Sequence, residues 1–232
     1  ITINAVNDEP SFVKGADQTI NEDAGLISVA TWATALNKGS ANENGQVLTF
    51  SVTNDNNGLF SQQPTVSGTT GDLTFTTALN AFGTATVSVV LSDNGGTADG
   101  GDNTYATQTF TITVNSVNDE PTFIKGADQV VDEDAGSQTV SGWATLISPG
   151  ALNENGQVLM FTVTNDNSAL FSVQPTIDPI TGDLIYTPAA NAFGSPNVSI
   201  ILSDNGGIVN GGDNVSATET FIVTVNTIND QP

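Results

Sequence analysis

A five-residue string recurs at a fixed interval and divides this chain into repeats. It reads Val-Asn-Asp-Glu-Pro at residues 6–10 and 117–121, and Ile-Asn-Asp-Gln-Pro at residues 228–232. Both intervals are 111 residues, and ungapped alignment of residues 6–116 with 117–227 matches 68 of 111 positions. That length is typical of one domain, and proline favours extended backbone at the residue before it. The sequence predicts two tandem domains, residues 6–116 and 117–227, joined by a short extended linker.

The two ends of the chain continue the same pattern. Ile1-Thr2-Ile3-Asn4 is similar to residues 112–115, which end the first repeat. We therefore expect residues 1–5 to be the end of a preceding repeat and residues 228–232 to be the start of the next linker. On this interpretation the sequence is a piece of a longer array.

The charge of the chain excludes one class of partner. Its 25 acidic residues face only Lys14, Lys38 and Lys125, with no arginine or histidine, so the formal net charge is −22. A phosphate backbone would be repelled, which argues against nucleic-acid binding. Cysteine is absent, so the redox compartment cannot be inferred from thiols. No run of 18 apolar residues indicates membrane insertion by this fragment.

Apolar residues alternate with polar ones, which predicts β-strands rather than disorder. In residues 109–114, for example, Phe110, Ile112 and Val114 share one face and threonines occupy the other. Similar segments in the first repeat are residues 18–20, 26–32, 47–52, 59–60, 73–75 and 86–91. About seven short strands per repeat, separated by Gly, Asn and Asp turns, predict an all-β Greek-key sandwich.

Each repeat has one tryptophan, Trp32 or Trp143, at a strand end. An exposed tryptophan would suit a sugar-stacking platform, whereas a buried one would belong to the core. We expect the core position.

Acidic and amide residues gather at strand ends and in the linkers. The first repeat has Glu22-Asp23, Asn42-Glu43-Asn44 and Asp93-Asn94, and the second has Glu133-Asp134, Asn153-Glu154-Asn155 and Asp204-Asn205. Ca²⁺ prefers oxygen ligands of this kind. Turn formation alone explains Asn, Asp and Gly there, but glutamate does not favour turns. We therefore expect Ca²⁺, in a site built from distant segments, because EF-hand spacing is absent and residues 95–99 fail the calcium nonapeptide pattern.

These motifs resemble those of cadherin repeats. Residues 118–123 are similar to the Asn-Asp-Asn-x-Pro-x-Phe linker, residues 21–25 to the Glu-Asn segment near the repeat start, residues 70–73 to the Thr-Gly-x-Ile/Leu turn and residues 91–96 to the Ala-x-Asp-x-Gly-Gly strand end. The likeness covers both repeats. It is closer still to the cadherin-like, immunoglobulin-like repeats in tandem in very large bacterial surface and secreted proteins, and it implies an extracellular location.

The resemblance implies a calcium cluster at each junction between repeats. The middle junction would use Glu22 and Asp23, the linker residues Asn118 and Asp119, and Asp204, with Asn153 and Asn155 in place of a cadherin Asp-x-Asp pair. The corresponding ligands at the other junctions would be Asn7, Asp8, Asn42, Asn44, Asp93, Glu133, Asp134, Asn229 and Asp230. The cadherin Leu-Asp-x-Glu motif is replaced by residues 78–82, so we expect fewer and weaker ions per junction.

One segment has no counterpart in the ordinary cadherin pattern. Residues 93–103 and 204–214 are glycine-rich hairpin tips that keep Asp102 and Asp213. Two interpretations stay open: a plain flexible loop, or a return of a further carboxylate to the Asp93 or Asp204 end.

Three functional classes remain to be weighed. An enzyme is disfavoured because His and Cys are absent and no Ser or Lys is paired with a base. A calcium-dependent carbohydrate-binding module attached to a secreted enzyme is the alternative. We favour a calcium-stiffened spacer or adhesion module whose partners are its neighbouring repeats, with a cell-surface glycan or protein as a further partner.

Overall fold

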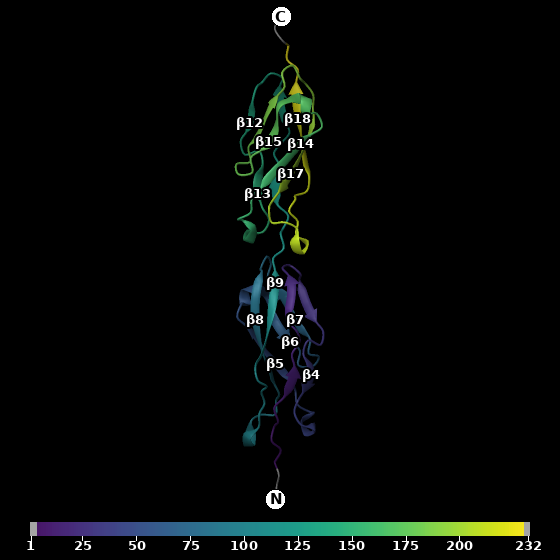
Figure 1. Ribbon diagram of the computed structural model, residues 1–232, viewed down its shortest axis with the longest axis vertical. Helices are drawn as coiled ribbons and strands as arrows, with labels where there is room; N and C mark the ends of the chain where they lie inside the picture. Colours follow the sequence, from purple (N-terminus) through teal and green to yellow (C-terminus); the bar gives the residue numbers. More distant parts are fainter. Residues whose placement is uncertain (1–3, 230–232) are drawn as a thin grey trace. The chain divides into compact units, whose positions relative to one another are not determined.

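The computed structural model describes residues 4–229 and divides into two compact units, Ile1–Ser116 and Val117–Pro232 (Figure 1). The strand segment proposed at Ile1 and the candidate ligand Asp230 fall partly or wholly outside the described residues. Each unit is described by itself below.

The first unit is built from nine strands. They are β1 (Ser11–Val13), β2 (Gln18–Asn21), β3 (Leu26–Val29), β4 (Thr34–Asn37), β5 (Thr49–Asn54), β6 (Phe60–Val66), β7 (Leu73–Thr77), β8 (Gly83–Ser92) and β9 (Gln108–Asn115). Three short 3₁₀ turns are η1 (Ala41–Glu43), η2 (Asn57–Leu59) and η3 (Ala98–Gly100). One sheet has the order β2-β9-β8-β5, a second the order β3-β7-β6, and β1 pairs with β4.

The second unit repeats this arrangement. Its strands are β10 (Thr122–Ile124), β11 (Gln129–Asp132), β12 (Gln138–Val140), β13 (Thr145–Ser148), β14 (Met160–Asn165), β15 (Phe171–Ile177), β16 (Leu184–Pro188), β17 (Asn197–Ser203) and β18 (Glu219–Asn226). The 3₁₀ turns are η4 (Leu152–Glu154), η5 (Ser168–Leu170) and η6 (Val209–Gly211). The sheets are β11-β18-β17-β14, β12-β16-β15 and β10-β13.

The prediction of an all-β sandwich is confirmed. The two main sheets of each unit contain seven strands, and the sequence did not reveal the additional pair, β1 with β4 or β10 with β13. The strand predicted at residues 26–32 is shorter, because Thr31 has a φ of 50° and ends the extended backbone. β17 is shorter than β8 because Pro196 stands where β8 has Ala85 and cannot donate to the ladder.

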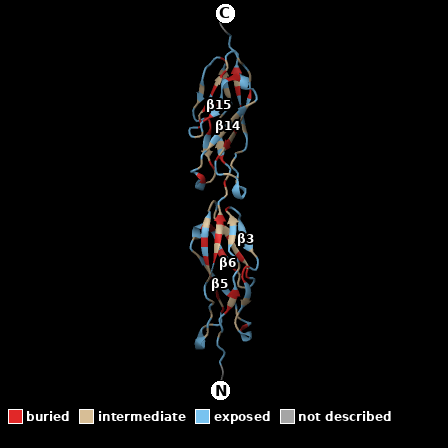
Figure 2. Ribbon diagram, viewed as in Figure 1, coloured by how far each residue is buried: buried red, intermediate tan, exposed pale blue. Residues whose placement is uncertain are grey.

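Each unit has its own core of buried strand residues, and Figure 2 shows buried positions along the strands of both units. Phe110, Ile112 and Val114 alternate inward on β9, as their spacing predicts. Trp32 is 3% exposed and its ring lies 4.4 Å from that of Phe110. Trp143 is 4% exposed and packs likewise on Phe221. The expectation that both tryptophans belong to the core is confirmed.

No helix in the described part of the chain has the length and apolar character of a membrane span.

Candidate cation-binding ends of the two units

A hydrogen-bonded network lies where the linker segment enters the first unit. The Asn7 amide Nδ2 donates to Asp93 Oδ1 at 3.0 Å and to the carbonyl of Asp102 at 2.6 Å. Asn7 Oδ1 accepts from Gln46 Nε2 at 2.6 Å. Asp93 Oδ1 also accepts from the backbone N–H of Gly95 at 2.8 Å. We call Asn7, Gln46, Asp93 and Asp102 the entry network of the first unit.

The second unit contains the same network with nearly the same distances. Asn118 Nδ2 donates to Asp204 Oδ1 at 3.0 Å and to the carbonyl of Asp213 at 2.6 Å. Asn118 Oδ1 accepts from Gln157 Nε2 at 2.6 Å, and Asp204 Oδ1 accepts from the N–H of Gly206 at 2.8 Å. The entry network of the second unit is therefore Asn118, Gln157, Asp204 and Asp213.

Both entry networks leave buried oxygens without a hydrogen-bond partner. These atoms are Oδ2 of Asp93 and of Asp204, and Oε1 of Gln46 and of Gln157. Asp93 is 7% exposed and Asp204 is 8% exposed. A buried carboxylate oxygen with no donor is costly and is usually satisfied by an ion or a water molecule. All four unpaired atoms are oxygens, the ligand atoms that Ca²⁺ takes.

The glycine-rich hairpins are part of these networks rather than separate flexible tips. Asp102 N–H donates to the carbonyl of Asn7 at 3.0 Å, so the returning arm of the hairpin pairs with the linker segment. A Cβ on Gly95 would lie 1.8 Å from Asn7 Oδ1, so only glycine allows this close approach. The Asp102 carboxylate is bound within its own turn. Its Oδ1 accepts from the N–H of Thr104 at 3.1 Å.

Glu43 and Glu154 accept hydrogen bonds from backbone N–H groups, a structural role that the sequence analysis did not consider for the glutamates of these clusters. Glu43 Oε1 accepts from the N–H of Asp8 at 2.9 Å, and Oε2 accepts from the N–H of Ser40 at 2.8 Å. Glu154 makes the equivalent bonds to Asp119 and Ala151. Both glutamates are buried and fix the linker segment against the 3₁₀ turn. Their positions are explained without a metal ion.

The amide residues beside these glutamates point outward. Asn42, Asn44, Asn153 and Asn155 are all exposed. The backbone carbonyl of Asn44 accepts from Lys38 Nζ at 2.9 Å. Among the linker residues, Asp8 accepts a short hydrogen bond from the Ser40 hydroxyl.

The opposite end of each unit contains the second group of candidate ligands. Glu22 and Glu133 are buried, at 3% and 6% exposed. Glu133 Oε1 accepts from the N–H of Ile228 at 2.9 Å, so this glutamate holds the strand exit. Asp134 Oδ1 accepts from the N–H of Asn191 at 3.2 Å, and Asp23 makes the same bond to Asn80 at 3.0 Å. Asn229, which follows the exit, is exposed.

Within residues 4–229, no three or more acidic, histidine or cysteine side chains converge into a group that could hold a metal ion. The entry networks contribute one buried carboxylate each, together with amide and carbonyl oxygens. Sequence reasoning missed Gln46 and Gln157, which bind the linker asparagine. The two glutamines stand beside the Asn-Glu-Asn clusters, and their recurrence in both repeats was the available signal.

Comparison with known proteins shows which fold the chain has and does not assign it to a family. No family model and no curated protein matches the chain. Human protocadherin-24 EC1-2, in crystal form II, is 15% identical, with 96% of this chain and 100% of that chain covered and a TM-score of 0.51. PcdhgB3 EC1-4 is 15% identical, with 99% of this chain and 52% of that chain covered and a TM-score of 0.54. These likenesses show a cadherin-like fold.

Proposed function

We propose that this chain is a calcium-stiffened spacer or adhesion module of a large extracellular protein, of the kind found on bacterial surfaces or secreted by bacteria. The observation that carries the proposal is the buried carboxylate of each entry network, Asp93 or Asp204, whose Oδ2 has no hydrogen-bond donor in either unit. A divalent cation is a suitable partner for such an oxygen.

The charge of the chain supports a cation rather than a protein side chain as that partner. Its three lysines cannot balance 25 acidic residues. Lys14 Nζ donates to the carbonyl of Thr109 and Lys38 Nζ to that of Asn44, so these two ammonium groups bind backbone. If a site brought two carboxylates within about 4 Å of each other, they would repel by roughly 4 kcal/mol at an effective dielectric constant near 20, and a bound Ca²⁺ would offset that repulsion.

In the proposed site, Asp204 and Asn118 of the entry network would bind Ca²⁺ together with Asp119. Glu22 and Asp23 of the preceding repeat would complete the coordination. Asn153 and Asn155 are exposed neutral ligands and would add little charge. A bound Ca²⁺ would attract each of these oxygens. Because the oxygens belong to successive repeats, the ion would limit the orientations that the repeats can adopt. With so few carboxylates we expect a dissociation constant of about 10⁻⁴–10⁻³ M.

The carbohydrate-binding alternative has less support. Both tryptophans that would form a sugar platform are buried. Phe82 and Phe193 are equivalent residues and are exposed, at 52% and 65%. Each unit therefore has a single exposed ring at this position, which is a small surface for stacking a sugar. A spacer role also fits the similarity of the repeats, which match at 68 of 111 positions, because a spacer needs copies of one unit.

Calorimetric titration of the two-repeat chain with CaCl₂ tests the proposal. Asp204→Asn should weaken calcium binding at least tenfold. Asp93→Asn removes the equivalent carboxylate of the first unit and reports on that entry network by itself. The matched control is Asp99→Asn, which removes one charge at a position where the second unit already has Asn210 with the same backbone, φ 57° against 60°. If Asp204→Asn and Asp99→Asn bind calcium alike, the proposed site is wrong.

A further inference from the structure

The second unit has an apolar surface beside Ile180 that the calcium proposal does not use. Two adjoining hollows of about 420 and 360 Å³ share Pro179 and Ile180. Leu146 and Ile147 line the first, and Val158 and Leu159 line the second. Ile180 is 91% exposed and Leu146 is 75% exposed. We call these six residues the Ile180 surface.

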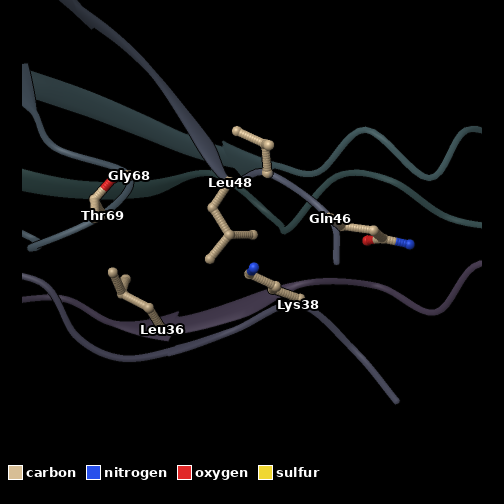
Figure 3. A pocket seen from close by; sticks show the side chains of 7 residues that line it. Leu36, Lys38, Gln46, Leu48, Gly68 and Thr69 are labelled. Atoms are coloured by element: carbon tan, nitrogen blue, oxygen red, sulfur yellow. The ribbon is translucent and has the colours of Figure 1, made fainter. Parts of the chain in front are cut away.

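The first unit has a hollow of about 350 Å³ at the place equivalent to the second of these hollows, and its lining is more polar than that of the second hollow. Figure 3 shows Leu48 pointing between Leu36 and Lys38, with Thr69 at the opposite rim. Lys38 and Thr69 occupy the positions of Pro149 and Ile180 in the second unit. The same fold therefore forms this hollow with or without a large apolar rim.

The sequence differences around the two hollows change both charge and apolar character. The second unit has Pro149 where the first has Lys38 in the lining of its hollow, and Asp178 in place of Ser67 in the turn before Ile180, so the surroundings of its hollows carry more negative charge. It also has Leu146 for Ala35, Pro179 for Gly68 and Ile180 for Thr69, which makes it more apolar and stiffer. Isolated exposed apolar residues need no explanation, but contiguous ones at a hollow indicate a binding surface.

Two carboxylates fix the rim of the Ile180 surface. Asp178 Oδ1 accepts from the N–H groups of Ile180 and Thr181 at 2.7 and 2.9 Å, which holds the turn that presents Ile180. These backbone donors, that of Thr181 first, lower the pKa of the Asp178 carboxyl, so it stays charged. Asp183 Oδ1 accepts from the N–H of Gly142, at the far side of the first hollow, at 2.8 Å.

The exposed side chain of Leu146 is attached to backbone in an unusual conformation. Leu146 has a φ of 49°, a left-handed conformation that leucine rarely adopts. Ala35 has a φ of 50°, so the fold imposes this conformation in both units. The second unit nevertheless has the larger apolar side chain at this strained and exposed position. Strained residues of this kind concentrate at binding sites.

We propose that the Ile180 surface binds an extended polypeptide segment with apolar side chains on one face and lysine or arginine at its flanks. Charge selects this occupant. Residues 117–232 contain 14 acidic residues and one lysine, so a cationic segment is attracted. A second copy of the chain, with its net charge of −22, is repelled. The hollows would take the apolar side chains, and Asp178 and Asp183 would face the flanking cations.

Amide NMR of the two-repeat chain in chelator tests this binding independently of calcium. The probe is the blocked peptide Lys-Leu-Ser-Phe-Lys, whose Leu and Phe share one face when the chain is extended. Control peptides replace both apolar residues by Ser or both lysines by Glu. We expect chemical shift changes at Leu146, Val158 and Ile180 with millimolar affinity, and weaker changes with either control peptide.

The matched variant carries Leu146→Ala and Ile180→Thr, the residues that the first unit already accommodates at these positions. It should fold normally and bind the probe about tenfold more weakly, equivalent to about 1.4 kcal/mol. Asp178→Ser should reduce binding more at low salt than at high salt. Three results would each overturn the proposal: no shifts at the Ile180 surface with 10 mM probe, equal shifts at Thr69 of the first unit, or shifts that follow the acidic entry networks instead.

Discussion

The two units share one entry network but differ at their hollows. Equivalent hydrogen bonds of the Asn7 and Asn118 side chains agree within 0.1 Å. The hollow beside Ile180, by contrast, has exchanged lysine, serine, glycine and threonine for apolar or acidic residues. Since both units fold, the fold tolerates change at the hollow. The entry network instead depends on close packing that few substitutions would preserve.

The outward strand faces show the same tolerance. The second unit exposes Val130, Met160, Val173 and Ile222, and the equivalent residues of the first unit are Thr19, Thr49, Gln62 and Thr111. A strand needs only its inward residues to be apolar. Differences on these faces therefore leave the core unchanged, and they are where the two repeats can acquire different partners.

The largest expected effect is in the shared core. Trp32→Ala should destabilise the first unit by about 3–5 kcal/mol, and Trp143→Ala should do the same to the second, because each removes a buried aromatic side chain. Guanidinium unfolding of the two-repeat chain, followed by fluorescence of the remaining tryptophan and by circular dichroism, would measure each unit. A difference of more than twofold between the two costs would show that the cores are not equivalent.

An intermediate effect is expected at the entry networks. Gly95→Ala and Gly206→Ala would each place a Cβ within 2 Å of the linker asparagine Oδ1, so the asparagine side chain must move and its hydrogen bond from Gln46 or Gln157 is disrupted. We expect a loss of about 1–3 kcal/mol in stability of the affected unit.

The control for this prediction is Gly45→Ala in the turn that follows η1. No atom lies within 4 Å of a Cβ at Gly45, and its φ is not positive, so the change should be within about 0.5 kcal/mol. Thermal unfolding of the three variants would compare them. Equal melting temperatures for Gly95→Ala and Gly45→Ala would mean that the hairpin does not need its contact with Asn7.

The smallest expected effect is a difference in alkaline stability. Burial raises the pKa of the Tyr186 hydroxyl above its usual 10.0. A raised folded pKa contributes stability that is fully present below pH 10 and is lost as the pH rises through the folded value. The first unit has Phe75 at this position and lacks this contribution.

Alkaline titration of the wild-type chain and of Tyr186→Phe, followed by circular dichroism, measures this difference. Tyr186→Phe should move the alkaline unfolding of the second unit to higher pH. An unchanged transition would show that ionisation of Tyr186 is not coupled to unfolding.

Much of the fold follows from the sequence because strands obey a period of two. Phe110, Ile112 and Val114 are buried as their alternation requires. Strand bounds were less predictable, since Thr31 ends its strand through a positive φ that propensity does not reveal. The short β1–β4 pair was also missed because its three- and four-residue strands carry too little alternation.

The candidate site was less predictable than the fold. Composition identified its acidic residues, but the role of each depends on which backbone N–H groups face it. Glu43 and Glu154 bind such groups with both oxygens, whereas Asp93 and Asp204 retain an oxygen without a donor. Gln46 contributes because it lies next to Asn7 in space, at 2.6 Å, although the two residues are 39 positions apart in the sequence. A local sequence motif cannot reveal such a contact.

Small-angle scattering of the two-repeat chain with calcium and with chelator tests the central claim most directly. If Ca²⁺ joins Asp119 and Asp204 to residues of the preceding repeat, calcium should increase the maximum dimension and narrow the distance distribution. Asp119→Ala should abolish that response while both units stay folded, because Asp119 is not a core residue. Equal profiles in calcium and in chelator, or a normal response of the Asp119→Ala chain, would contradict the calcium-stiffened spacer.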